Sequence, residues 1–151
     1  QALYLHFPGR AELLIATTLH IDEVKGIQDR MTPSRAAKSG PERLRAFIDA
    51  WGGYIPEIHG VSVGLRQMQG SEAREAWAMR MSAMKEGCAA AVAALAAEGA
   101  LAPHLTQAQA TDLLWSLLSV EFWERLRRDC GWSQRQYLDE VHRLSRAGLI
   151  A

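Results

Sequence analysis

The chain has 151 residues, 48% of them hydrophobic and 23% charged, which suits a single globular domain with a buried core. Its 17 basic and 17 acidic residues balance, which excludes a general electrostatic attraction to nucleic acid or to an anionic membrane. Apolar runs are shorter than the roughly 18 residues of a membrane span, and the two cysteines, Cys88 and Cys130, lie far apart, so a soluble cytoplasmic protein is predicted.

The first part of the chain predicts a long helix that follows a turn. Residues 2–6 have the character of a helix end, and a turn is expected at residues 8–9, where proline precedes glycine. Over residues 10–31, apolar side chains recur at steps of three, four and seven, which predicts one continuous helix. Residues 32–40 begin with Thr-Pro-Ser and remain polar, so the helix is expected to stop there and a loop to follow.

A second helix is predicted to start at Pro41, which suits a first helical turn because its missing amide hydrogen costs nothing there. Apolar residues over 44–55 form one face of this helix. The pair Gly52-Gly53 and then Pro56 predict that the helix ends or kinks at that point. For residues 57–70, which contain three glycines, we expect a short helix that carries Val63, Leu65 and Met68.

The second half predicts three further helices. From Ser71 to about Gly99, apolar side chains recur at steps of three and four, and the glycine is a typical helix stop. Capping-box sequences at 106–109 and 133–136 predict helices over about 107–129 and 134–147. The first of these is apolar nearly all round, so it must be covered on more than one side, which favours association between subunits.

Several segments resemble regulators of the TetR family. The opening residues 3–14, LYLHFPGRAELL, are similar to the end of that family's DNA-recognition helix, the following turn and the start of the next helix. Residues 95–103, 110–115 and 128–133 are similar, in order and spacing, to the C-terminal domain of one branch of the family.

This resemblance implies an all-α fold, a TetR-type C-terminal bundle of about six helices that dimerises through a four-helix interface. Residues 1–9 would then be the end of a helix-turn-helix DNA-binding domain, the rest of which would lie upstream of Gln1. Residues 10–151 would form the effector-binding and dimerisation domain.

The resemblance also implies DNA contacts near the start of the chain. Tyr4 and His6 would lie at the end of the recognition helix, and Arg10 would take the place of the family's basic residue at the start of the next helix. A phenol, an imidazole and a guanidinium beside a helix start are suitable phosphate contacts. The alternative is that aromatic residues here, Phe7 above all, only pack the short segment against the following helix.

Aromatic, methionine and other apolar residues on several predicted helices suit a cavity for a bulky apolar or aromatic ligand. Such a stripe at helical spacing can also be ordinary core, and that alternative stays open. The predicted ligand-binding set is Trp51, Tyr54, Ile55, Met68, Trp77, Met81, Met84, Cys88, Trp115 and Phe122.

In the family, the last two long helices of each subunit form the dimer interface, and a two-fold dimer would match a palindromic operator. The predicted interface residues are Leu113, Leu117, Val120, Trp123, Tyr137, Val141 and Leu144.

The resulting hypothesis is a ligand-responsive repressor that binds operator DNA as a homodimer and is released by a small hydrophobic or aromatic effector. The alternative is a dimeric helical module that binds or sequesters a ligand without any DNA function. The histidines lack HxxxH or HExxH spacing and no GxSxG or phosphate-binding glycine loop occurs, so neither an enzyme nor a metal or cofactor site is predicted. His20, Asp22 and Glu23 are interpreted as an exposed helix face.

Overall fold

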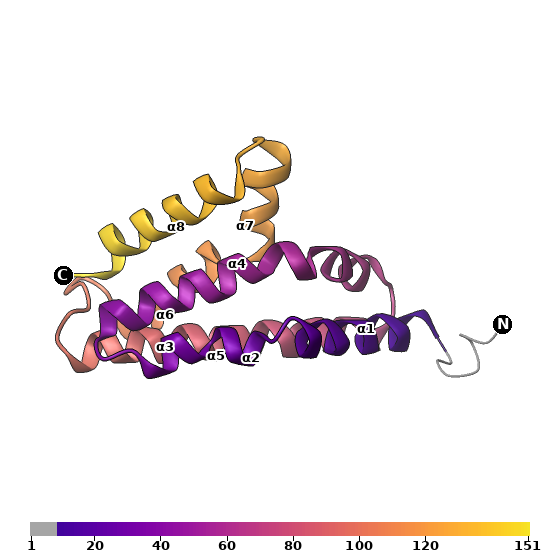
Figure 1. Ribbon diagram of the computed structural model, residues 1–151, viewed down its shortest axis with the longest axis horizontal. Coiled ribbons are helices and arrows are strands. Elements are labelled where there is room, and N and C mark those ends of the chain that lie inside the picture. The colour runs from indigo at the N-terminus through magenta and orange to yellow at the C-terminus, as the bar shows by residue number, and fades with distance from the viewer. Residues whose placement is uncertain (1–8) are drawn as a thin grey trace.

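The computed structural model describes residues 9–151, and this part of the chain is helical, with one isolated β-bridge between Leu101 and Ile150. Tyr4 and His6 lie outside the described residues. Figure 1 shows helix α4 running through the middle of the molecule, with α1, α2, α3 and α5 along one side and α7 and α8 along the other. The predicted all-α fold is confirmed.

The predicted helix over residues 10–31 is interrupted near its C-terminal end. Helix α1 spans Arg10–Val24, and Gly26 then adopts a left-handed conformation with φ of 62°, which favours glycine because a Cβ is strained there. Two short helices follow, α2 over Ile27–Arg30 and α3 over Thr32–Ala36. The predicted stop at residue 32 is therefore the start of another helical turn, and the loop is confined to residues 37–39.

Helix α4 spans Gly40–Gln67 without a break, so the predicted end at residues 52–56 is wrong. Its start follows the prediction, with Pro41 in the first turn. Pro56 has no amide hydrogen to donate to the carbonyl of Gly52 one turn earlier. The side-chain amide of Gln134 donates to that carbonyl instead, at 3.0 Å, and so replaces the missing helical bond. Residues 57–67 can then continue the helix.

Helix α5 spans Ser71–Ala97, and Gly99 follows with φ of 68°, as the sequence predicts. Two glycines allow α4 and α5 to approach closely. A Cβ built on Gly40 would lie 2.8 Å from the backbone of Leu95, and one built on Gly87 would lie 2.7 Å from the ring of Phe47. The backbones of the two helices are therefore nearly in contact at Gly40, and the ring of Phe47 lies directly on the backbone of α5 at Gly87.

The predicted helix over 107–129 is divided into segments that point in different directions (Figure 1). Helix α6 spans Gln107–Leu117, α7 spans Val120–Glu124, and a π-helical turn covers Arg125–Asp129. The hydroxyl of Ser119 accepts a bond from the amide of Phe122 at 3.1 Å and so caps α7. The carbonyl of Leu118 accepts a bond from the indole of Trp51 at 3.2 Å. The two bonds give hydrogen-bond partners to the Leu118 carbonyl and the Phe122 amide, which lie on either side of the break between α6 and α7.

Helix α8 spans Gln134–Leu149, close to its predicted range. Both predicted capping boxes form, at Thr106 with Gln109 and at Ser133 with Gln136. The main core joins α4, α5, α6, α7 and α8. No helix within residues 9–151 is long and apolar enough to cross a membrane.

Candidate ligand cavity

A cavity of about 280 Å³ lies among α1–α5. Its wall combines a few charged side chains with a larger apolar surface. The lining residues used below are Asp22, Ile27, Gln28, Met31, Arg35, Arg43, Phe47, Trp51, Arg80, Met84 and Gly87.

An ion pair joins α1 to α5 at this cavity. The carboxylate of Asp22 accepts two bonds from the terminal nitrogens of Arg80, at 2.6 and 2.7 Å. The hydroxyl of Tyr54 on α4 donates to the same carboxylate. The Arg80 side chain is 13% exposed and that of Asp22 is 23% exposed, so water screens this pair only weakly. Asp22 thus ties three helices together.

The pKa values of Tyr54 and Arg80 are both raised in this arrangement. Burial raises the pKa of Tyr54, and its hydrogen bond to Asp22 and the negative charge of that residue raise it further. Burial alone would lower the pKa of Arg80, but the hydrogen bonds and charge of Asp22 more than offset it, so the pKa is raised. The phenol therefore stays neutral and the guanidinium stays charged at neutral pH.

Two further guanidinium groups lie on the wall. Arg35 donates to the side-chain and backbone oxygens of Gln28, at 2.5 and 3.4 Å, and these partners carry no charge. Arg43 makes no ion pair within residues 9–151. The charged wall therefore holds three cations and one anion.

The apolar wall is formed by large side chains from α4 and α5. Trp51 is 6% exposed, and because its indole nitrogen donates away to Leu118, it offers the cavity a ring without a free donor. Phe47 and Met84 extend this surface. Gly87 leaves space for the ring of Phe47, which would collide with any larger residue.

The predicted ligand-binding set is divided between this cavity and other places. Trp51 and Met84 line the cavity, and Tyr54 holds its ion pair. Ile55 and Cys88 are fully buried in the main core. Burial raises the pKa of the Cys88 thiol to about 12, so the side chain is an inert core group.

Three more members of the set lie together elsewhere. Trp77, Met81 and Trp115 line a second hollow of about 480 Å³ between α5 and α6. The ammonium of Lys85 lies 5.0 Å from the centre of the Trp115 ring. Phe122 packs near Tyr137 in the main core, with ring centres 6.4 Å apart, and Met68 packs against a small separate cluster around Leu65.

The polar part of the cavity was not predicted. Asp22 was interpreted as part of an exposed face, and that interpretation is wrong for this residue, although His20 and Glu23 are exposed. Arg80, its partner, lies 58 positions further along the chain. No local pattern links two charges at such a distance.

The predicted dimer residues differ in their accessibility. Leu113 is 47% exposed on α6, and Leu117 and Leu144 are partly buried. The other four are at most 5% exposed within the single chain, so a partner could reach them only after rearrangement; they are Val120, Trp123, Tyr137 and Val141.

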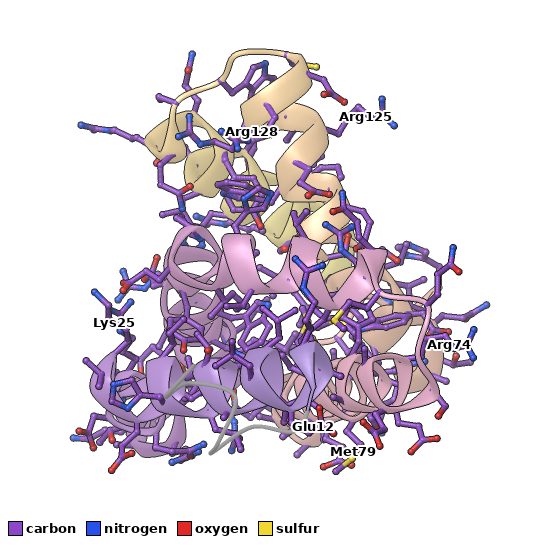
Figure 2. The ribbon with its side chains drawn as sticks, turned by 90° about the vertical axis from the view of Figure 1, so that its right-hand side faces the viewer. Glu12, Lys25, Arg74, Met79, Arg125 and Arg128 are labelled. Atoms are coloured by element: carbon purple, nitrogen blue, oxygen red, sulfur yellow. The ribbon has the colours of Figure 1, made fainter. Side chains whose placement is uncertain are left out.

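Surface side chains away from the cavity point outward. Figure 2 shows Lys25, Arg74 and Met79 extending from the periphery of the molecule, and Met79 is 74% exposed on α5. Arg10, the one predicted DNA contact within the described residues, is exposed at the first position of α1.

The fold has a known relative. The structure is similar to the crystal structure of a TetR-family transcriptional regulator from Streptomyces coelicolor A3, with a TM-score of 0.64 and 23% sequence identity over 98% of this chain and 75% of that one. No protein-family model and no curated protein sequence matches the chain significantly. The chain therefore has a TetR-like fold, as the sequence resemblance implied.

Proposed function

We propose that the chain is the effector-binding and dimerisation part of a ligand-responsive transcriptional repressor. The observation that supports this best is the cavity among α1–α5, because α1 contributes Asp22 to its wall. In the sequence, α1 directly follows the segment that resembles the end of a recognition helix. A ligand in the cavity would thus act on the helix that leads to the DNA-binding part.

The attachment of α1 supports a role as a lever. Only Ala11 and Thr18 of this helix are buried, whereas Leu19 and Val24 are each 64% exposed. Leu14, Ile15 and Ile21 pack against the core but are only partly buried, and the ion pair of Asp22 with Arg80 adds a polar attachment near the C-terminal end of α1. A helix held in this way can shift when a ligand changes the polar contact.

The proposed homodimer uses the accessible side chains of α6 and α8, Leu113, Leu117 and Leu144. In sedimentation experiments, we expect a dimer that dissociates at least about 100-fold more readily in a Leu113→Glu, Leu117→Glu variant. Met79→Glu is the control, since it places a carboxylate on an exposed apolar site of α5. A wild-type monomer at about 100 μM would contradict the dimer.

The regulatory function is tested with the protein expressed from its complete reading frame. We expect it to enrich a palindromic sequence from a random duplex library, with DNA contacts that include Tyr4, His6 and Arg10. Compounds that bind the cavity should weaken this binding. If cavity ligands bind and no DNA is enriched, the protein is the alternative, a dimeric ligand-binding or sequestering module.

A further inference from the structure

We propose that the cavity binds a small organic anion with an apolar body, and that this anion loosens α1 by competing with Asp22 for Arg80. This inference rests on the proposed function in so far as it assigns the cavity to the effector. It adds the charge of the ligand and the contact through which the ligand acts.

The charge of the wall favours an anion. Asp22 neutralises Arg80, while Arg35 bonds only to neutral groups and Arg43 has no acidic partner within residues 9–151. The wall therefore carries two guanidinium charges that no carboxylate balances. A carboxylate or similar group can bind such donors in pairs, whereas a cation would be repelled.

The rest of the wall favours an apolar body of limited size. Trp51 presents a ring whose only donor is already used, and Phe47, Met84 and Met31 add apolar surface. The volume of about 280 Å³ lies at the lower limit of small-molecule pockets, which are roughly 300–1,000 Å³. A benzene ring, a naphthalene ring or a medium-length alkyl chain is the appropriate scale.

Arg80 is placed to connect the ligand with α1. Both of its terminal nitrogens bond to Asp22, while its Nε is buried and has no hydrogen-bond partner. An anion in the cavity attracts the guanidinium, and the unpartnered Nε becomes available as a donor once the side chain shifts toward the anion. It also repels the Asp22 carboxylate in a site that water screens weakly. Both effects weaken the bond between α5 and α1.

The first experiment compares matched acids and amides on the 151-residue chain. The probes are benzoate, 2-naphthoate and octanoate, each beside its neutral amide, with binding followed by calorimetry and tryptophan fluorescence. At least one acid should bind about tenfold or more tightly than its amide, and the double variant Arg35→Met, Arg43→Met should remove that preference. Equal affinity for acid and amide, or no binding of any acid at millimolar concentration, would overturn the proposal.

The second experiment tests the competition with Asp22. In Asp22→Asn, the shape is kept and the competing charge is removed, so acid affinity should rise about tenfold while amide affinity stays the same. Glu140→Gln, which removes a carboxylate from an exposed pair with Arg143, should change neither. Unchanged or weaker acid binding by a folded Asp22→Asn variant would exclude the competition.

Amide hydrogen exchange tests whether the bound acid loosens α1. If Asp22 only stabilises the fold, the acid should not change the exchange rate of this helix. The bound acid should speed amide exchange over residues 10–24 in the wild-type chain. In Asp22→Asn, exchange there should already be fast and should not respond to the acid. Slower exchange in the wild type on acid binding would contradict the mechanism. These measurements need no DNA, so the ligand class can hold even if the repressor function fails.

Discussion

Replacing Gln134 by methionine should destabilise the chain although it conserves the side-chain volume. The amide of Gln134 donates to the carbonyl of Gly52 at 3.0 Å and accepts from the indole of Trp123 at 2.8 Å. Methionine removes both bonds and leaves two polar groups in buried residues without partners. At about 1 kcal/mol for each bond, the expected loss is about 2 kcal/mol.

A double-mutant cycle with Pro56 separates the two bonds. In Pro56→Ala, the new amide hydrogen can donate to Gly52 along the helix, so this carbonyl no longer depends on Gln134. The Gln134→Met change should then cost only about 1 kcal/mol, which represents the bond to Trp123.

Thermal and urea unfolding, followed by circular dichroism, measure the four members of the cycle. For a domain of this size, a loss of about 2 kcal/mol corresponds to a Tm lowered by roughly 4–8 °C. If Gln134→Met costs the same with proline and with alanine at position 56, the side chain does not replace the missing bond of α4, and the explanation of the continuous helix is wrong.

Three further predictions concern the cavity, the thiols and the response to acid. Gly87→Ala should lower stability by about 1–2 kcal/mol in unfolding experiments and weaken cavity ligands, because the added methyl group collides with Phe47. A thiol reagent should label exposed Cys130 rapidly at pH 8, but Cys88 only upon unfolding, because burial raises its pKa to about 12. Ion pairs with Lys25 and Arg30 lower the pKa of Glu57, so its stabilisation, below about 1 kcal/mol, is present at pH 7 and is lost as the pH falls through the lowered pKa.

Each of these predictions has a control. Gly60→Ala, also within a long helix but in open space, should be neutral or stabilising, and an equal loss at both positions would contradict the collision. Cys130→Ser should abolish the rapid labelling; persistent labelling would show that Cys88 is accessible. Glu57→Gln should destabilise the chain at pH 7 and progressively less as the pH falls through the lowered pKa, and an effect that does not change with pH would exclude the ion pair.

Local signals in the sequence predicted the ends of helices well. The capping boxes at Thr106 and Ser133, Pro41 in a first turn and Gly99 after a helix all depend on residues within a few positions of one another. Because their bonds are local, the sequence pattern contains everything needed to infer them. The all-α fold followed from the same patterns.

Where a helix breaks or continues because of a residue far away in the sequence, the sequence pattern did not predict it. Helix α4 passes Pro56 because Gln134, 82 positions from Gly52, supplies the missing donor. The predicted helix over 107–129 breaks beside Leu118, whose carbonyl bonds to Trp51, 67 positions away. Neither contact can be inferred from the spacing of apolar residues along the chain. The same holds for the cavity, where apolar Trp51 and Met84 were predicted but the ion pair on its polar side was not.

The close contact between α4 and α5 also limits which wall of the cavity can yield to a ligand. At Gly87 the ring of Phe47 on α4 lies directly on the backbone of α5, so this side of the cavity cannot widen without disturbing the core. The opposite wall consists of the short helices α2 and α3, which lie between the left-handed Gly26 and the loop at 37–39. A ligand larger than the cavity is therefore expected to displace α2 and α3 before it separates α4 from α5.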